Sequence, residues 1–312
     1  MILVGVDAGG TSTRGVAVSE SGRPIGSARG GPGALHERTA VEAAQAIARV
    51  VLEATGGEAA EVVVAGVSGA ADPEVGAALH QALEGQGVGK RVHVVADAAI
   101  ALEGAFPGQA GIVVIAGTGS VAWGRNASGE EARAGGWGYL LDRGSGVDIG
   151  RRVLAAVLRA HESGAPATRL TAEVGQVLGL GGVDDLARAV RALRTADLAG
   201  LAPSALVAAA TGEAVAQEIL TDAAEDLARA AQTVWNRLRF AAPHPVAGTG
   251  RLFSHPMMRE AFRMAMRRAC PQADVRSPHM PPVGGALWKA FALGGREFPA
   301  VIRSALEETP LD

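Results

Sequence analysis

LVGVDAGGTSTRGVAVS, residues 3–19, decides the fold of this chain. Apolar residues at 3–6 predict a strand that leads directly to Asp7, and the alternating residues 15–18 predict a second strand. The turn between them, AGGTST at 8–13, combines two glycines with three hydroxyl side chains. Glycines allow a tight bend with accessible backbone N–H groups, so such a hairpin can cradle a phosphate. Asp7, where the strand ends, suits a hydrated Mg²⁺ held by one carboxylate; an ordinary glycine-rich hairpin is the simpler alternative.

The same pattern occurs a second time at residues 111–125, GIVVIAGTGSVAWGR. An apolar strand is followed by the turn GTGS at 117–120, and then by another alternating strand. This repetition predicts a second domain built on the same plan, because two matched hairpins are much less probable by chance than one. Two such cradles facing each other across a cleft would hold one polyphosphate from both sides.

Composition narrows the choice of partners. The chain has 312 residues, a formal net charge of −3 and 48% hydrophobic residues, so we expect a globular protein with two domains. A charge so close to neutral gives no electrostatic reason to expect nucleic acid or an anionic membrane as a partner.

The single cysteine, Cys270, excludes an internal disulfide, a cysteine zinc site and an all-cysteine iron–sulfur cluster within one chain. None of the seven histidines is paired at metal-ligand spacing. The chain enters a strand at once, without a basic leader region or a long apolar run, so neither a signal peptide nor a membrane span is expected. The cytoplasm is the expected location.

The remaining elements follow from periodicity and from helix-boundary residues. Further strands are expected at 61–67, 92–96, 246–250 and 274–276. Helices are expected at 37–55, 73–84, 98–105, 147–162, 171–178, 184–193, 204–210, 213–240, 256–269, 281–292 and 299–308. The first hundred residues therefore predict a hairpin followed by alternating helices and strands, which is typical of an α/β domain.

The position of the repeat sets the predicted domain boundary near residues 108–111. We expect one domain to comprise residues 1–109 together with about 294–312. Residues 110–293 would form the second domain, which includes a helical insertion.

Two further places carry candidate site residues. The loop AGGWGYLLDRGSGVDIG at 134–150 is rich in glycine and carries Trp137, Tyr139 and Asp142. Close backbone approach, an aromatic face and a carboxylate together suit a sugar or another polyol, although a structured surface loop is the alternative. Asp97 stands between a buried strand and a helix, where it suits an N-cap as well as a catalytic carboxylate.

A resemblance to a known family rests on five motifs: VGVDAGGTST at 4–13, ADAA at 96–99, IAGTGS at 115–120, GGWGYLL at 135–141 and GTGRLFS at 248–254. With them the chain resembles the actin-like ATPase and sugar kinase superfamily. Within it, the chain is similar to the BadF/BadG/BcrA/BcrD-type ATPase family, above all to its N-acetylglucosamine kinase branch. The resemblance implies an α/β, two-domain actin-like ATPase (ribonuclease H-like) fold, in which each domain has a mixed sheet opened by a phosphate hairpin and surrounded by helices.

The resemblance also implies roles for individual residues. Asp7 would position Mg²⁺ through water, and Asp97 would be the catalytic base that takes a proton from the attacking sugar hydroxyl. The nucleotide would be bound by Gly9, Gly10, Thr11 and Ser12 on one side of its phosphates, by Gly117, Thr118 and Gly119 on the other, and by Gly212, Gly248, Thr249 and Gly250 near adenosine. The sugar would be bound by Asp97, Gly135, Gly136, Trp137 and Asp142.

Two departures from the family pattern concern the sugar site. The family usually has a sugar-contacting Asn after the first hairpin, whereas residues 31–36 read GPGALH, with Ala34 or His36 near that place. The usual GDEGSG is one residue shorter here, DRGSG at 142–146, with Arg143 where Glu is expected. Because both changes spare the ATP site, ATP use is a firmer expectation than the identity of the sugar.

The expected function is therefore an ATP-dependent kinase acting on a hydroxyl of an amino sugar. N-acetylglucosamine is the first choice, while glucosamine, a muramyl sugar or another acceptor stays open, and a homodimer is expected. One alternative is an ATPase that couples hydrolysis to another process through a cluster shared across a dimer, which the lone Cys270 disfavours. Another is a sugar-sensing regulator without catalysis, which would need an added DNA-binding segment that is not seen. The P-loop pattern is absent.

Overall fold

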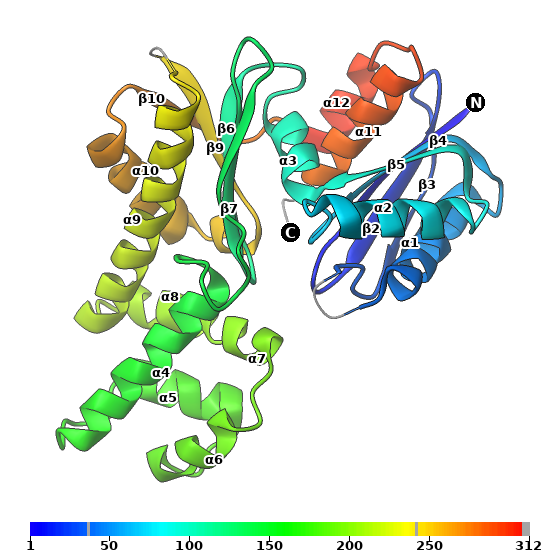
Figure 1. Ribbon diagram of the computed structural model, residues 1–312. Helices are drawn as coiled ribbons and strands as arrows, with labels where there is room; N and C mark the ends of the chain where they lie inside the picture. The colour runs from blue at the N-terminus through cyan, green and yellow to red at the C-terminus, as the bar shows by residue number, and fades with distance from the viewer. Residues whose placement is uncertain (36–37, 241–242, 308–312) are drawn as a thin grey trace. The chain divides into compact units, whose positions relative to one another are not determined.

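The computed structural model describes residues 1–35, 38–240 and 243–307, and the chain divides into two compact units (Figure 1). Unit 1 comprises Met1–Val113 and the C-terminal segment that begins at Ser277. Unit 2 comprises Val114–Arg276. Each unit is built around a five-stranded sheet of its own.

The sheet of unit 1 has the order β3-β2-β1-β4-β5. Its strands are β1 (Ile2–Ala8), β2 (Thr13–Ser19), β3 (Pro24–Gly30), β4 (Ala60–Val67) and β5 (Gly89–Ala96). The first three strands pair antiparallel through short turns, whereas β4 and β5 add parallel to β1 after helical crossovers. The sheet is therefore mixed, as the sequence predicts. Strand β3 was not predicted, because PIGSARG shows no apolar alternation.

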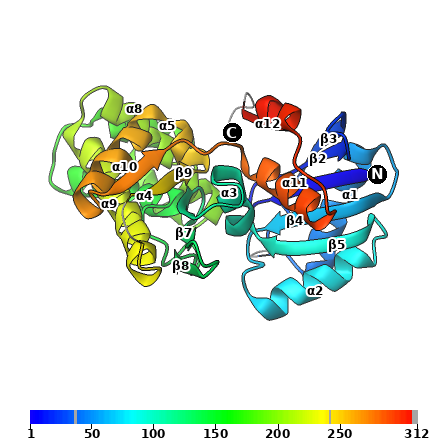
Figure 2. The same ribbon diagram turned by 90° about the horizontal axis from the view of Figure 1, so that it is seen from above.

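Helices cover both faces of this sheet (Figure 2). Alternate residues of β1 point to opposite faces. Val4 and Val6 therefore pack in the cluster with α1 (Ala40–Thr55), and Leu3 packs with Leu287 on the other face. The first face also holds α2 (Pro73–Glu84), which begins as predicted with Asp72 as N-cap and Pro at the first helical position. The second face holds α3 (Asp97–Ala105), α11 (Pro282–Leu293) and α12 (Ala300–Glu307).

Helices α3 and α11 contact each other through backbone atoms. A Cβ at Gly285 would lie 1.9 Å from Ile100 O and 2.4 Å from Gly104 N, so only glycine permits this approach. Glu103 is buried beside the contact, where it pairs with Lys289 at 3.5 Å. Because α11 packs in this way, the chain returns to unit 1 at Ser277, which corrects the predicted return near residue 294.

The sheet of unit 2 has the order β10-β9-β6-β7-β8. Its strands are β6 (Gly111–Ala116), β7 (Ser120–Arg125), β8 (Glu131–Gly135), β9 (His244–Thr249) and β10 (Ala273–Arg276). Strands β7 and β8 pair antiparallel and β9 and β10 pair parallel, so this sheet is mixed as well. Both units thus open with adjacent strands joined by a short glycine turn.

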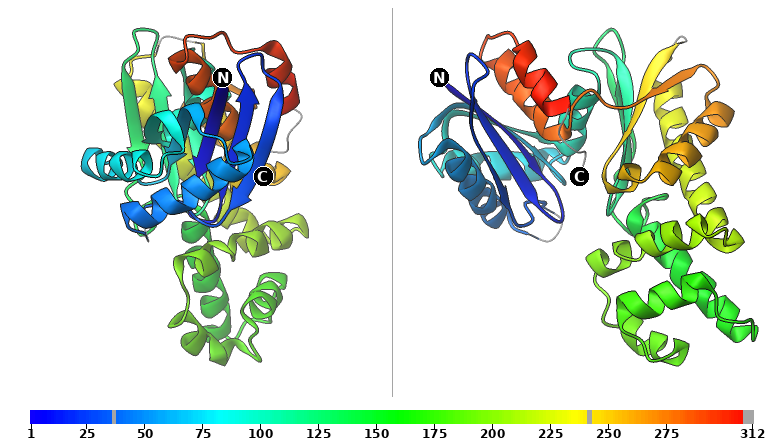
Figure 3. Two further views of the ribbon diagram at one scale, coloured as in Figure 1. Left: turned by 90° about the vertical axis from the view of Figure 1, so that its right-hand side faces the viewer. Right: turned by 180° about the vertical axis from the view of Figure 1, so that it is seen from behind.

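Most of the helices of unit 2 lie in the segment between β8 and β9, and helix α9 packs along β7 and β8 (Figure 3). They are α4 (Gly146–Glu162), α5 (Arg169–Leu178), η1 (Val183–Asp185), α6 (Leu186–Val190), α7 (Thr195–Ala199), α8 (Ala202–Ala210) and α9 (Ala214–Arg237). After β9 come η2 (Arg251–Ser254) and α10 (Pro256–Ala269). The helix predicted at 184–193 is replaced by η1 and the short α6, and the one predicted to reach residue 240 ends at Arg237.

Candidate functional site

The first glycine turn is exposed at one end of the sheet of unit 1. The β1–β2 register ends with Ala8 opposite Thr13, so residues 9–12 form the turn, and Gly9 N donates to Ser12 O at 2.9 Å. The three residues at the tip, 10–12, are exposed, and a Cβ at Gly10 would meet no atom within 4 Å. The predicted turn thus leaves space for a ligand beside its backbone.

The loop after β3 closes against the base of this turn. Gly33 N and Ala34 N both donate to Gly9 O, at 3.1 and 3.2 Å. Ala34 is buried, and Thr13 beneath it donates to Gly31 O at 2.8 Å. Ala34 therefore packs in the interior of the unit. His36, the other residue predicted to lie near the position of the family's sugar-contacting Asn, is outside the described residues.

Asp7 and Asp97 come together through the strand between them. Asp7 lies opposite Gly66 of β4, Gly66 lies opposite Val95 of β5, and Asp97 begins α3 directly after β5. A Cβ at Gly66 would lie 2.3 Å from Ile100 Cδ1, so the glycine lets α3 approach the sheet. The carboxyl ends of parallel strands meet at one edge, which is where ligands bind in α/β sheets.

The proximity of these carboxylates changes their electrostatics. The pKa of Asp7 is raised to about 7, chiefly by burial and then by the charge of Asp97, while Arg14 opposes the shift. Asp97 is half-buried, and its Oδ1 accepts a hydrogen bond from Ala98 N at 2.8 Å. The residue at the N-cap position is Ala96, which offers no side-chain cap. Asp97 therefore lies within the first turn of α3 and not at its N-cap.

The second glycine turn rests on the start of α4. Gly146 N donates to Gly117 O at 2.7 Å, and Val147 N donates to Thr118 O at 3.3 Å. All three residues of the turn, 117–119, are half-buried, and a Cβ at Gly117 would meet no atom within 4 Å. The first N–H groups of the helix are thus satisfied by the turn, which supports its backbone from below.

The third glycine turn joins the second at the same end of the sheet. Gly250 has φ of 95°, and a Cβ there would lie 2.7 Å from Ala116 O, at the end of β6. Gly248 packs its α-carbon against the ring of Phe253, and Thr249 is buried. These contacts bring residues 117–119 and 248–250 together.

Gly212 forms a separate turn between α8 and α9. It has φ of 89° and is exposed, and a Cβ there would meet no atom within 4 Å. Its backbone N–H donates to Ala209 O at 3.0 Å, within the same turn, and not to residues 117–119 or 248–250. Its predicted place beside adenosine therefore stays a prediction.

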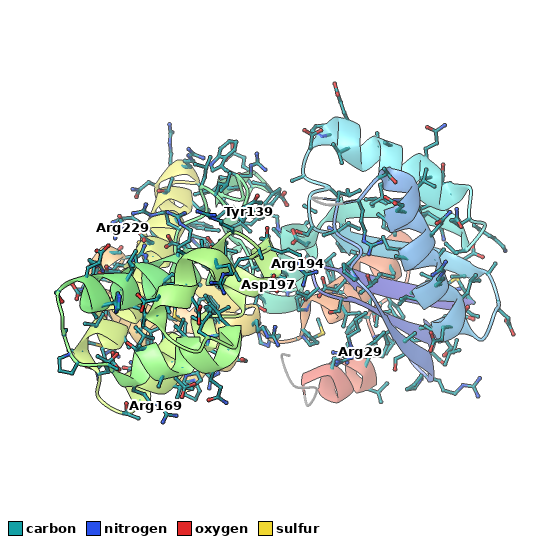
Figure 4. All side chains as sticks on the ribbon, turned by 90° about the horizontal axis from the view of Figure 1, so that it is seen from below. Arg29, Tyr139, Arg169, Arg194, Asp197 and Arg229 are labelled. Atoms are coloured by element: carbon teal, nitrogen blue, oxygen red, sulfur yellow. The ribbon has the colours of Figure 1, made fainter. Side chains whose placement is uncertain are left out.

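The loop after β8 presents an exposed apolar surface. Gly135, Gly136 and Gly138 have φ of 79°, 70° and 103°, which only glycine adopts readily. Trp137 between them is 68% exposed, and the guanidinium of Arg133 lies 4.9 Å from its ring centroid. Tyr139, labelled in Figure 4, is exposed as well. Such a face can stack against a sugar ring.

Asp142 differs from the expectation that it accepts hydrogen bonds from a substrate. It is 6% exposed; its Oδ1 accepts from Trp137 N at 2.8 Å, and its Oδ2 accepts from Ser120 N at 3.4 Å. Burial raises the pKa of Asp142, while the backbone hydrogen bonds, above all that from Trp137, lower it. Its carboxylate therefore organises the loop from within, because both oxygens are already engaged with the backbone.

Three residues that sequence reasoning did not assign to the site support these turns: Ser145, Asp148 and Arg152. Ser120 of the predicted GTGS turn also helps, since its Oγ donates to Arg143 O at 2.6 Å. Ser145 is the N-cap of α4 and accepts from Asp148 N at 3.2 Å. The spacing Ser-x-x-Asp at 145–148 is the signal that could have revealed this cap.

None of the described helices combines the length and the apolar character needed to span a membrane. No group of three or more His, Cys, Asp or Glu side chains in the described ranges is arranged to hold a metal ion.

Two α/β units, each with a mixed sheet and a glycine–threonine turn between adjacent strands, define a protein with the actin-like ATPase and sugar kinase fold, as predicted. Solved structures agree. The structure of a Chromobacterium violaceum protein provisionally named an N-acetylglucosamine kinase has a TM-score of 0.78 and 28% identity, over 93% of this chain and 98% of that one. A ROK family glucokinase from Streptomyces griseus, solved with glucose and AMPPNP, shares the fold with a TM-score of 0.62 and 19% identity, over 93% and 98% of the two chains.

Sequence comparison is more specific. The model of the BadF/BadG/BcrA/BcrD ATPase family matches residues 4–289, and the chain belongs to this family. An N-acetylmuramic acid/N-acetylglucosamine kinase from Clostridium acetobutylicum is 30% identical over 72% of this chain and 76% of its own length. An N-acetyl-D-glucosamine kinase from Dictyostelium discoideum is 33% identical over the same shares of the two chains. Membership implies that the protein uses ATP.

Proposed function

We propose that this protein transfers the γ-phosphoryl group of ATP to a hydroxyl of an amino sugar, with N-acetylglucosamine as the first acceptor to test. The observation that carries the proposal is the pair Asp7 and Asp97, which share one edge of a sheet beside an exposed glycine–threonine turn. The names of the two curated relatives support the acceptor class, since both are kinases of N-acetylated amino sugars.

Nucleotide binding is assigned to the glycine turns. Residues 9–12 of unit 1 and residues 117–119 of unit 2 would meet the terminal phosphates with backbone N–H groups and hydroxyls. Residues 248–250 and Gly212 would lie beside adenosine. Backbone donors suit phosphate because they carry partial positive charge in fixed directions and add no bulk.

Asp7 fits a magnesium ion. Mg²⁺ keeps several waters and needs only one or two carboxylates when it also binds phosphates, so the lack of a larger acidic cluster in the described ranges is consistent with it. A carboxyl whose pKa is raised to about 7 by burial and by a neighbouring carboxylate is one that a cation would stabilise in its ionised form. When bound, Mg²⁺ would supply neutralising charge beside the phosphates.

Asp97 is assigned the role of general base. It begins α3 directly after β5, and its Oδ1 accepts a hydrogen bond from Ala98 N at 2.8 Å. A base that accepts the proton of the attacking hydroxyl typically contributes about 10²–10⁴-fold. Transfer of the phosphoryl group through a loose transition state leaves the protein mainly with alignment and with charge stabilisation.

The loop after β8 is assigned to the sugar. Gly135 and Gly136 allow close approach, and exposed Trp137 offers an apolar ring face. In this proposal Asp142 holds the loop in shape and does not contact the sugar. The expected homodimer and cytoplasmic location stay predictions, which light scattering and cell fractionation would test.

A direct test mixes the purified protein with Mg-ATP and a panel of hexosamines, including N-acetylglucosamine, glucosamine and N-acetylmuramic acid, and measures ADP release and the sugar phosphate formed. We expect sugar-dependent ADP release with at least one N-acetylated amino sugar. ADP release that is independent of every sugar would instead favour an ATPase coupled to another process. No ADP release with any sugar would contradict the kinase proposal.

A further inference from the structure

A buried charge network lies at the start of α4. Arg152 Nη2 is 2.7 Å from Asp148 Oδ2; the same guanidinium bonds Asp226 of α9, and its Nη1 is 3.4 Å from Asp222. The side chains of Arg152, Asp148 and Asp226 are 20%, 5% and 12% exposed. One guanidinium thus compensates three carboxylates, of which two are largely removed from water.

Asp148 connects this network to the backbone. Its Oδ2 also accepts from Gly144 N at 3.0 Å, and Asp148 N donates to Ser145 Oγ at 3.2 Å. Ser145 Oγ in turn donates to Asp142 O at 2.9 Å. Gly144 has φ of 72°, and a Cβ there would lie 2.5 Å from Ala223 O, so this backbone is held on both sides.

The chain of contacts continues into the second glycine turn. Gly146 N and Val147 N bind the carbonyl oxygens of Gly117 and Thr118. In a trans peptide the carbonyl and the following N–H lie in one plane and point in opposite directions. Fixing the carbonyls of Gly117 and Thr118 toward α4 therefore directs the N–H groups of Thr118 and Gly119 away from the helix. Those are the donors assigned to the nucleotide phosphates.

We propose that Arg152 is a positioning residue for this phosphate turn, an inference that rests on the proposed function of residues 117–119. Without its guanidinium, the buried carboxylate of Asp148 would be left uncompensated beside a second carboxylate, Asp226, which is strongly unfavourable. Asp226 keeps contacts with Arg229 at 3.2 Å and Arg143 at 3.7 Å, whereas Asp148 pairs with no cation other than Arg152 among the described residues. Asp148 would therefore be displaced, and the start of α4 and the turn would move with it. Arg229, a residue of α9, is labelled in Figure 4.

The test uses the full chain and compares Arg152→Met with Arg159→Met. Arg152 and Arg159 both line a cavity of about 490 Å³ between α4 and α9, and Arg159 lies two turns further along α4. Unlike Arg152, Arg159 has no contact with a carboxylate in the described part of the chain. We expect Arg152→Met to raise the Kd for Mg-ADP and the KM for ATP by about tenfold or more, because small displacements of positioning groups carry large effects. Arg159→Met should stay within about twofold of the wild type in both quantities.

A second substitution separates charge compensation from packing. Asp148→Asn in the Arg152→Met background removes the uncompensated charge, while its amide oxygen can still accept from Gly144 N. We expect the double variant to recover ADP affinity to within about threefold of the wild type, a coupling that a mere loss of packing would not produce.

The outcomes distinguish this inference from the proposed function. A folded Arg152→Met that binds Mg-ADP within twofold of the wild type would overturn the inference, and so would a double variant without recovery. If Arg152→Met does not fold, Arg152→Gln decides, since its amide can still donate a hydrogen bond to Asp148 while the positive charge is lost; an unchanged Kd there overturns the inference. A wild type that binds ADP but phosphorylates no sugar contradicts the kinase proposal alone. A wild type that does not bind ADP contradicts both.

Discussion

Replacing Asp7 by Asn should stabilise the ligand-free protein at alkaline pH while it removes the response to magnesium. Burial and the charge of Asp97 raise the pKa of Asp7 from 3.8 to about 7 in the folded state. Between these values the folded protein binds more protons than the unfolded chain, so the stability decreases as the pH rises from about 4 to about 7. At 1.36 kcal/mol per pKa unit, the full shift corresponds to about 4 kcal/mol lost at pH 8.

The side chain of asparagine has nearly the same shape as that of aspartate but does not ionise, so Asp7→Asn does not lose stability as the pH rises. Urea unfolding of wild type and Asp7→Asn at pH 5, 6, 7 and 8, followed by circular dichroism, should show a difference that grows with pH to a few kcal/mol in favour of the variant. Glu58→Gln, an exposed residue of unit 1, serves as the matched control and should change the stability by less than about 0.5 kcal/mol.

Magnesium provides the second readout. Millimolar Mg²⁺ should raise the unfolding midpoint of the wild type at pH 8, because a cation beside Asp7 stabilises the charged form, and it should not affect Asp7→Asn. A difference between the two proteins that is flat from pH 5 to pH 8 would refute the electrostatic reasoning. An equal response of both proteins to Mg²⁺ would refute the assignment of Asp7 to the metal.

Three other substitutions follow from the same structure. Asp97→Asn should keep Mg-ADP affinity within a few-fold while kcat decreases about 100-fold or more, and equal losses in binding and turnover would indicate a folding defect. Asp142→Asn leaves one of two backbone N–H groups without an acceptor, so the KM for the sugar should rise about tenfold while the KM for ATP changes little; an unchanged sugar KM would speak against its role in the loop. Gly285→Ala places a Cβ against the backbone of α3 and should destabilise unit 1 by about 3 kcal/mol in urea unfolding, whereas Gly175→Ala, with open space around it in α5, should be neutral or stabilising.

The sequence alone determined the elements whose pattern is local. The strand leading to Asp7, the two glycine–threonine turns and the helix at 256–269 follow from the repeat of apolar residues over a few positions and from residues that start or stop a helix. The same local motifs were sufficient to indicate the family, which the match over residues 4–289 confirms. Strand β3 was missed because its seven residues lack such a pattern.

Only the tertiary structure decided which distant residues meet. Asp7 and Asp97 become neighbours because β1, β4 and β5 pair in parallel with Gly66 between the two acids, and no short-range pattern encodes that register. Asp142 carries a carboxylate, a group that often binds sugar hydroxyls, yet folding buries it and both its oxygens accept hydrogen bonds from the backbone. A side chain's type is local information, whereas its burial and its partners depend on the packing of segments far apart in the chain.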